Sequence, residues 1–467
     1  MSRNYNVKTS GVIMAEQIEQ RYQTIQFLSD LLHSGQDTEF IESFESLHDF
    51  EMAQVYADLP EQFRSVAWRL LSIDILARVF DNLDIDEVDI VKLLQELPPQ
   101  RGVLVLQEMY ADNEADLLQE MPARLVATYL SLMSKSEADT VRKLIDYDEQ
   151  TAGSLMSTEY LAVEEELHVD EVMRLVKKQA LAAESISYVY VLDLQERLAG
   201  VISLRDLLTH PDNLAVSEIT NDRIISVKAG DDQEDVAQIV ADYNFLSIPV
   251  TDDENRLLGV ITVDDIVDVI DEEAVEDYSG LAAVNVSQIN DTPWHSAIKR
   301  IPWLIALLVL GMATATLISS YDQLVQQASI LAAFISLITG TAGNAGTQAL
   351  ALAVRRIAVG SDNSGWKNFF SEILAGIIVG MATGFSVFVI VAIWKHNSIL
   401  GFAVGLAMTM ASIVANLAGY LIPVLIDKMG FDPAVASGPF ITTLSDLTSV
   451  LIYFNVAQLF ISHFVGR

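Results

Sequence analysis

The chain has 467 residues, 51% of them hydrophobic, and a formal net charge of −36. The residues before Asp291 hold 57 of the 64 acidic side chains but only 20 of the 28 basic ones, so an acidic soluble half precedes an apolar, nearly neutral half. Because cysteine is absent, disulfides and thiolate-bound metals are excluded. The opening residues lack the apolar core of a secretion signal, so we expect the acidic half to lie in the cytoplasm.

After an N-terminal tail at 1–24, residues 25–150 show a helical pattern with a loose repeat. The three copies read YADLPEQFRSVAWRLL, LQELPPQRGVLVLQEM and LQEMPARLVATYLSLM. Each has a proline at a helix start followed by apolar residues three and four apart. The pattern predicts an acidic all-α domain of stacked short helices. A bundle without any ligand and a regulatory domain fit this pattern equally well.

Residues 151–212 and 213–272 form a second repeat with a different period. AESISYVYVLDLQERLAGVISLRDLL matches ADYNFLSIPVTDDENRLLGVITVDDIVDVI, each with two apolar strands around a polar turn and then a helix. Such a pair predicts two α+β units stacked through their sheets. Both units resemble CBS domains.

The remaining residues, 299–467, contain five apolar spans, each long enough to cross about 30 Å of hydrocarbon. We place them at about 301–320, 328–354, 369–393, 399–426 and 434–464. Most of the basic residues between spans fall on one side. By the positive-inside rule the acidic half is cytoplasmic, the C-terminus lies outside, and the protein is a multi-pass protein of the plasma (inner) membrane.

Asp446 is a lone carboxylate inside the fifth apolar span, SGPFITTLSDLTSVLIYF. A charge at bilayer depth costs at least ~2.5–3.5 kcal/mol, so it should face protein, water or a cation. On a helix, Gly438, Thr442 and Asp446 lie one above another. This stripe suits a hydrated cation, and the alternative is a structural Asp hydrogen-bonded to nearby Thr residues or backbone.

The second span contains SLITGTAGNAGTQ at 336–348, which has few apolar side chains. Loosely wound backbone at membrane depth survives only when it is buried in protein or lines a water-filled path. We therefore expect this stretch to lend carbonyls, hydroxyls and the Asn344 amide to a pore wall. Tight packing of a broken helix is the alternative, and the two are compatible.

An acidic segment, TVDDIVDVIDEEAVEDYSGL, links the second repeat to the first span through a predicted connecting helix at 273–298. Carboxylate clusters suit Mg²⁺ or Ca²⁺, whereas a simple solvated acidic face is the alternative. The helical pattern predicts two faces: Asp265, Asp268, Glu272 and Glu276 on one, and Ile266, Val267, Ile270 and Ala274 on another.

Nucleotide binding is a weaker prediction that follows from the CBS-like units. Asp206 and Asp265 lie where such domains commonly hold a ribose, and Arg205 would attract a phosphate that the carboxylate of Asp264 would repel. The first unit, with Tyr188 as a stacking partner, is therefore the better adenine-nucleotide candidate. We find no catalytic motif and do not expect an enzyme.

In this order, an acidic helical domain, a CBS pair, an acidic connecting helix and five spans resemble the MgtE family of magnesium channels. TGTAGNAGTQ, DPAVASGPFITTLSDLT and LIDYDEQTAGSLMSTEY are similar to family sequences. The resemblance implies a homodimer that takes up Mg²⁺ through a pore between its membrane domains, with Asp446 as the pore carboxylate. Thr442, Gly438 and Asn344 complete the predicted pore site.

The resemblance also implies a cytosolic Mg²⁺ sensor. Its predicted residues are Asp265, Asp268, Glu272, Glu273, Glu276, Asp277 and Glu234. High internal Mg²⁺ would bridge the acidic domains and let the connecting helix hold the pore shut, whereas repulsion would open it when Mg²⁺ is scarce.

Three positions depart from the family pattern: Asn244 replaces an acidic residue, Gly438 an Asn, and Ser336 a Pro. These departures predict a weaker or missing sensor site and a gentler break in the second span, and they leave the ion ranking open. The alternative function is a CBS-regulated carrier of Co²⁺, Mn²⁺ or Ni²⁺ with adenine nucleotide, such as ATP, as main regulator. A third is a Mg²⁺ sensor that is merely anchored in the membrane.

Overall fold

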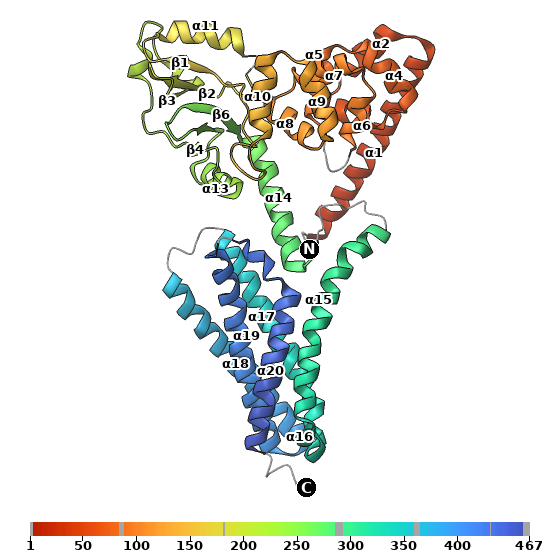
Figure 1. Ribbon diagram of the computed structural model, residues 1–467, viewed down its shortest axis with the longest axis vertical. Helices are drawn as coiled ribbons and strands as arrows, with labels where there is room; N and C mark the ends of the chain where they lie inside the picture. The colour runs from red at the N-terminus through yellow and green to blue at the C-terminus, as the bar shows by residue number, and fades with distance from the viewer. Residues whose placement is uncertain are drawn as a thin grey trace. The chain divides into compact units, whose positions relative to one another are not determined.

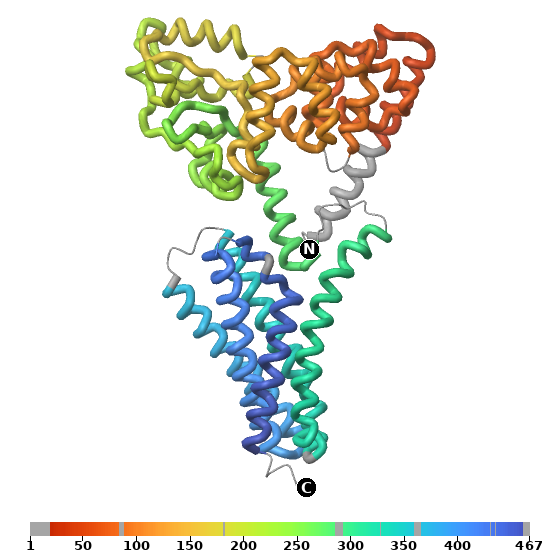
Figure 2. The backbone as a smooth tube through the Cα atoms, viewed as in Figure 1, coloured from red at the N-terminus to blue at the C-terminus, as the bar shows by residue number. Residues whose placement is uncertain are grey.

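The computed structural model describes residues 3–83, 88–180, 183–284, 293–358, 365–429 and 431–460, with side chains from residue 19 onward. It divides into two compact units, residues 1–270 and 271–467. Figure 1 labels the elements of both, and Figure 2 follows the backbone through the described segments.

The first unit opens with a run of helices around a core of Leu, Phe and Tyr side chains. The first helix already begins at Arg3, so the predicted boundary between tail and helical domain at residue 24 falls inside a continuous helix. The helices are α1 (Arg3–Ser34), α2 (Asp37–Glu45), α3 (Asp49–Asp58), α4 (Glu61–Leu70), α5 (Ile73–Asp81), α6 (Ile90–Gln95), α7 (Pro99–Leu106), α8 (Ala111–Gln119), α9 (Ala123–Leu132) and α10 (Lys135–Ile145).

The predicted proline repeat is confirmed. Pro60, Pro98 and Pro122 are the N-cap residues of α4, α7 and α9. Proline is tolerated there because the first N–H groups of a helix have no partner within the helix. The result is a stack of short helices in which α3 packs on α5, α5 on α7 and α7 on α9.

Two three-stranded sheets follow, which confirms the duplicated α+β units. In each, the first strand pairs in parallel with the second, and the second pairs antiparallel with the third. The sheets share an apolar cluster and a buried hydrogen bond of 2.8 Å between Tyr190 Oη and Ser247 Oγ. The elements are β1 (Ala162–Glu164), α11 (Val169–Gln179), β2 (Tyr188–Leu192), β3 (Leu198–Ser203), α12 (Leu204–Thr209), η1 (Val216–Glu218), β4 (Val227–Lys228), α13 (Gln233–Tyr243), β5 (Ser247–Thr251) and β6 (Leu257–Thr262).

Helix α14 (Val263–Ala282) runs straight through the predicted boundary at residue 272. Its predicted apolar face is wrong in part. Ile266 and Val269 are the buried residues, whereas Val267 and Ile270 are 59% and 49% exposed. A spacing of three keeps 266 and 269 on one side, and both join the core of the second sheet. Residues 285–292 of the predicted connecting helix lie outside the described residues.

The second unit contains five helices long and apolar enough to cross a membrane, in agreement with the predicted spans. Helix α19 packs against α17, α18 and α20, while α15 packs on α20. The elements are α15 (Pro293–Ser320), α16 (Asp322–Gln327), η2 (Ser329–Phe334), α17 (Ile335–Ala358), α18 (Gly365–Lys395), α19 (Ser398–Asp427), η3 (Pro433–Val435) and α20 (Gly438–Leu459).

The expectation of loosely wound backbone at 336–348 is wrong. Helix α17 is continuous through this stretch, and the irregular turn lies earlier, in the 3-10 helix η2. Ser336, where family members often have a Pro, is the second residue of α17 and follows that turn. The irregular turn therefore forms before this position, without a proline there.

The glycines of α17 serve close packing instead. A Cβ atom on Gly346 would lie 3.0 Å from Ile441 Cγ2, 3.0 Å from Ser445 Oγ and 3.2 Å from the Ala415 carbonyl oxygen. On α19, a Cβ atom on Gly419 would collide with the carbonyl oxygen of Gly346. Small residues let helix backbones approach in lipid, where apolar burial alone gives no preference for helix over lipid contact. These contacts fix how α17 is rotated about its axis.

We predict that Gly419→Ala lowers the melting temperature of the detergent-purified protein by several degrees. The added methyl group must displace backbone, and such overpacking costs roughly 1–3 kcal/mol. Gly340→Ala is the matched control because no atom lies within 4 Å of the Cβ it would add. Equal melting temperatures for wild type and Gly419→Ala would contradict the close approach of α17 and α19.

Candidate functional site

Asp446 lies in the middle of α20 with its side chain half-buried. Helix α20 carries all three residues of the predicted stripe, and Thr442 Oγ1 donates a 2.9 Å hydrogen bond to the Gly438 carbonyl one turn earlier. Helix α17 crosses this stripe with bare backbone. A Cβ atom on Gly343 would lie 3.0 Å from Thr442 Cγ2 and 3.8 Å from Asp446 Oδ1. The site therefore combines a carboxylate with a helix surface that carries no side chain.

Asn344, the fourth predicted pore residue, follows Gly343 and is exposed. Within the described chain, the structure brings together Asp446, Thr442 and Gly343. The Asn344 amide lies on the exposed surface of α17. Its exposure leaves that amide available to a partner or to water.

The hydroxyl groups around Asp446 are used elsewhere. Thr443 Oγ1 donates to the Pro439 carbonyl at 2.8 Å, and Thr448 Oγ1 donates to the Leu444 carbonyl at 3.1 Å. Among the described residues, the Asp446 carboxylate accepts no hydrogen bond. The alternative of a structural Asp bonded to neighbouring threonines is therefore not what the structure shows.

A second carboxylate cluster lies in the first unit, where three parts of the chain meet. Asp112 from α8, Glu184 before β2 and Asp265 from α14 offer oxygen atoms that all lie within 4.8 Å of one another. Only Asp265 was predicted. Glu184 lies 81 residues and Asp112 lies 153 residues before Asp265 in the sequence.

Burial and mutual repulsion govern the charge of this cluster. Burial, and next the Asp265 carboxylate, hold the pKa of Asp112 well above its ordinary value. Burial likewise raises the pKa of Glu184 to about 8. Asp112 Oδ1 and Glu184 Oε2 are buried without a hydrogen-bond partner. Unpaired acceptors so arranged suit a hard divalent cation, which prefers oxygen ligands.

Asp265 is held in place by a helix cap. One of its oxygens, Oδ2, accepts hydrogen bonds from the Thr262 backbone N–H at 3.0 Å and from the Thr262 hydroxyl. The other oxygen is left for the cluster. Burial raises the pKa of Asp265, although the Thr262 bonds oppose the shift.

In the second unit, the last turns of α14 carry another acidic contact. Burial raises the pKa of Asp277, and the carboxylates of Asp432 and Glu276 raise it further. Asp432 belongs to the segment just before α20. The end of α14 is close to this segment, because a Cβ atom on Gly280 would lie 2.5 Å from Ala434 Cβ. Asp277 and Glu276 were predicted, whereas Asp432 was missed.

The other predicted sensor residues are not gathered into a compact cluster in the part of the chain that the structure describes. Asp268, Glu272 and Glu234 are exposed, and Glu273 is partly exposed. Asn244 closes α13 in a left-handed conformation with φ of 56°, which Asn tolerates better than most residues. This conformation gives the departure at Asn244 a local structural reason.

The predicted nucleotide residues lie at the same place in the first repeat. Asp206 Oδ2 accepts a hydrogen bond of 3.2 Å from the Ser203 backbone N–H, so it caps α12 as Asp265 caps α14. Arg205 is exposed and has no ion pair among the described residues. Tyr188 is partly buried in the cluster between the sheets.

One further charged residue inside a span was missed. Glu372 on α18 is 4% exposed and forms a 2.6 Å ion pair with Arg356 of α17. Its carbonyl oxygen accepts a 3.3 Å hydrogen bond from Asn416 Nδ2 of α19. Unlike Asp446, this carboxylate is paired and ties three helices together.

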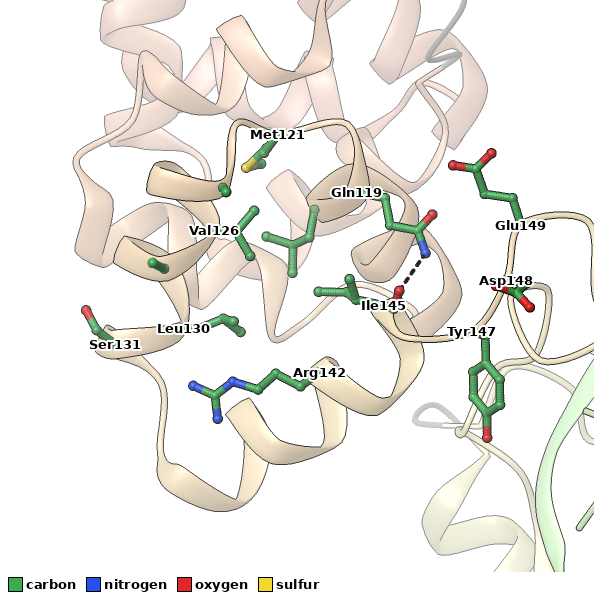
Figure 3. Close-up of a pocket in the computed structure, with 13 residues that line it drawn as sticks. Gln119, Met121, Val126, Leu130, Ser131, Arg142, Ile145, Tyr147, Asp148 and Glu149 are labelled. Atoms are coloured by element: carbon green, nitrogen blue, oxygen red, sulfur yellow. Dashed lines mark hydrogen bonds between the residues drawn. The ribbon is translucent and has the colours of Figure 1, made fainter.

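A groove of about 880 Å³ lies between α8, α9 and α10 (Figure 3). Leu118, Met121 and Val126 line it, and Arg142, which pairs with Asp139 at 2.9 Å, lies at its edge. None of the predicted site residues borders it.

Comparison with known proteins agrees with this architecture. Family models match residues 335–456 (divalent cation transporter), 47–150 (MgtE intracellular N domain), and 152–212 and 216–272 (CBS domains). The chain is 50% identical to the magnesium transporter MgtE of Enterococcus faecalis, over 94% of this chain and 97% of the relative. It is 35% identical to that of Bacillus subtilis, over 92% and 96%.

A crystal structure of the soluble part of a magnesium transporter has a TM-score of 0.53 and 43% identity, and it covers 54% of this chain and 99% of that one. The fold, the order of the domains and the near full-length identity lead to one conclusion. The chain belongs to the MgtE family of divalent cation transporters.

Proposed function

We propose that the protein is a homodimeric Mg²⁺ channel that takes up magnesium across the cell membrane and closes when cytosolic Mg²⁺ is high. One observation carries the proposal: the Asp446 carboxylate lies in a membrane-spanning helix, has no hydrogen-bond partner among the described residues, and is beside the bare backbone of Gly343. A charge at this depth requires water or a cation. The magnesium-transporting relatives make Mg²⁺ the first choice.

A second copy of the chain would complete the pore. Two Asp446 carboxylates facing one path would hold an ion between them, and the ion would offset their repulsion. Because Mg²⁺ sheds water reluctantly, we expect the carboxylates to hold it through its hydration shell. The exposed Asn344 amide is then available to those waters.

Orientation follows from the basic residues. With Lys299, Arg300, Arg355 and Arg356 inside, the acidic half lies in the cytoplasm and the C-terminus outside. The carboxylates of the first unit then meet the cytosolic Mg²⁺ pool that uptake raises.

Cytosolic Mg²⁺ would act at Asp112, Glu184 and Asp265. These residues come from the helical domain, the first CBS unit and α14, so one ion would join three segments that otherwise repel. Asp277 and Asp432 provide a second contact, between the end of α14 and the start of α20. Ion binding at both would favour the closed state over the open one.

We also propose that an adenine nucleotide binds the first CBS unit. The support is the unpaired Arg205 guanidinium, which could hold phosphate within an otherwise acidic half, with Asp206 for the ribose and Tyr188 for the base. Regulation by nucleotide alone, in a carrier of Co²⁺, Mn²⁺ or Ni²⁺, is the alternative. It predicts flux that responds to nucleotide and not to cytosolic Mg²⁺.

Asp446→Asn should nearly abolish Mg²⁺ uptake into liposomes at low internal Mg²⁺, because the path loses its charge. Asp322→Asn on α16 is the matched control and should conduct like wild type. Wild-type flux and ion preference in Asp446→Asn would mean that the pore lies elsewhere.

Asp112→Asn should weaken the rise in melting temperature that Mg²⁺ gives the purified protein, and should raise the Mg²⁺ concentration needed to stop flux. The variant removes a ligand and also relieves repulsion, so its Mg²⁺-free form should melt higher than wild type. Asp242→Asn, on the exposed side of α13, controls for loss of one negative charge. An unchanged Mg²⁺ response in Asp112→Asn would remove this cluster from the sensor.

A further inference from the structure

Helix α17 exposes a second amide that the pore site described above does not use. Gln348 lies four residues after Asn344, so the two side chains lie on one face, about 6 Å apart along the helix axis. Both are exposed, and neither side-chain amide is hydrogen-bonded in the part of the chain that the structure describes.

The orientation of this face is fixed by packing. The opposite face of α17 is buried through Ala342, Gly346, Ala349 and Ala353, and Gly346 touches both α19 and α20. The helix cannot turn without breaking these close contacts. Asn344 and Gln348 are therefore held away from the protomer's own core.

Contact with lipid hydrocarbon would be unfavourable for this face of α17. An amide without a hydrogen-bond partner in hydrocarbon costs several kcal/mol. Two such amides lie one turn apart on α17, the helix whose Gly343 approaches the half-buried Asp446. Their exposure points to a water-filled path.

The depth of Gln348 adds a further argument. A Cβ atom on Gly438 would lie 3.8 Å from Thr347 Cγ2, so residues 347 and 348 are level with Gly438. Gly438 begins α20 and has no side chain to offer an ion. At this level the exposed face of α17 carries Gln348, one turn from Asn344 on the Arg355 side.

We propose that Gln348 is a specificity-determining residue that accepts a hydrogen bond from the water shell of the transported cation at the level of Gly438. The inference rests on the proposed pore along α17 and α20. The amide oxygen recognises a bound water and not the bare ion, so its effect depends on how firmly the cation keeps its water. Mg²⁺ keeps its waters more firmly than Ca²⁺, which takes more ligands in a flexible geometry.

The test compares Gln348→Leu, Gln348→Asn and wild type in liposome flux with Mg²⁺ and Ca²⁺ supplied separately. Loss of a hydrogen bond is worth about 0.5–1.5 kcal/mol, so Gln348→Leu should raise the half-saturating Mg²⁺ concentration roughly two- to tenfold. It should also reduce the preference for Mg²⁺ over Ca²⁺, while Gln348→Asn should recover part of both. Gln458→Leu, the same change at an exposed position near the end of α20, should alter neither.

The proposal is overturned if Gln348→Leu keeps the wild-type Mg²⁺ concentration dependence and ion preference. It is also overturned if the variant dissociates the dimer in detergent while ion preference stays unchanged, because Gln348 is then a contact between subunits. If Asp446→Asn is inactive but Gln348→Leu behaves like wild type, the role of Gln348 is rejected and the proposed pore stands. Normal flux in Asp446→Asn would instead remove the pore itself.

Discussion

A carboxylate without a partner inside a membrane helix is the constraint on which the membrane unit depends. Glu372 shows the ordinary solution, because Arg356 lies 2.6 Å away and the pair joins neighbouring helices. In the part of the chain that the structure describes, no cationic side chain pairs with Asp446, and the threonines around it donate to backbone carbonyls. The two carboxylates of this helix bundle thus differ: Glu372 is paired within the protein, whereas Asp446 is left for water, a cation or a second subunit.

The acidic half of the chain also holds carboxylates whose charge is costly to bury. Three of its carboxylates, those of Asp112, Glu184 and Asp265, lie close together and at least partly buried. Burial raises their pKa values, which means that the folded chain holds these charges at a cost. A cation bound there would offset this electrostatic cost only when the three segments that carry the carboxylates are together. In the proposed sensor, repulsion and ion binding would therefore oppose each other at one cluster, which is what a reversible switch requires.

Much of this could be predicted from sequence because it is periodic or local. The proline-led helices, the duplicated β-β-α units, the spans and the Gly438–Thr442–Asp446 stripe all follow from spacing within about twenty residues. Asp112 and Glu184 could not be found this way, since only the fold brings them to Asp265. Asp432 was missed for the same reason.

The prediction of loosely wound backbone in the glycine-rich stretch of α17 was wrong for a different reason. Glycines clustered in a span are typical both of a broken helix and of a helix packed closely against its neighbours. Nothing in the stretch itself separates these cases. The deciding residues are Gly419 and Ala415 on α19 and Ser445 on α20, whose contacts with Gly346 become visible only in three dimensions.

Gly438 shows how closely the proposed gate and pore are joined. A Cβ atom there would lie 3.2 Å from the Leu281 carbonyl oxygen at the end of α14 and 3.8 Å from Thr347 Cγ2 on α17. Gly438 is thus both the first residue of α20 and part of the surface on which α14 ends. A larger side chain at 438 would offer the ion another ligand but would press on the Leu281 carbonyl, so it would alter gating together with selectivity. With glycine here, the end of α14 approaches α20 without having to displace a side chain at position 438.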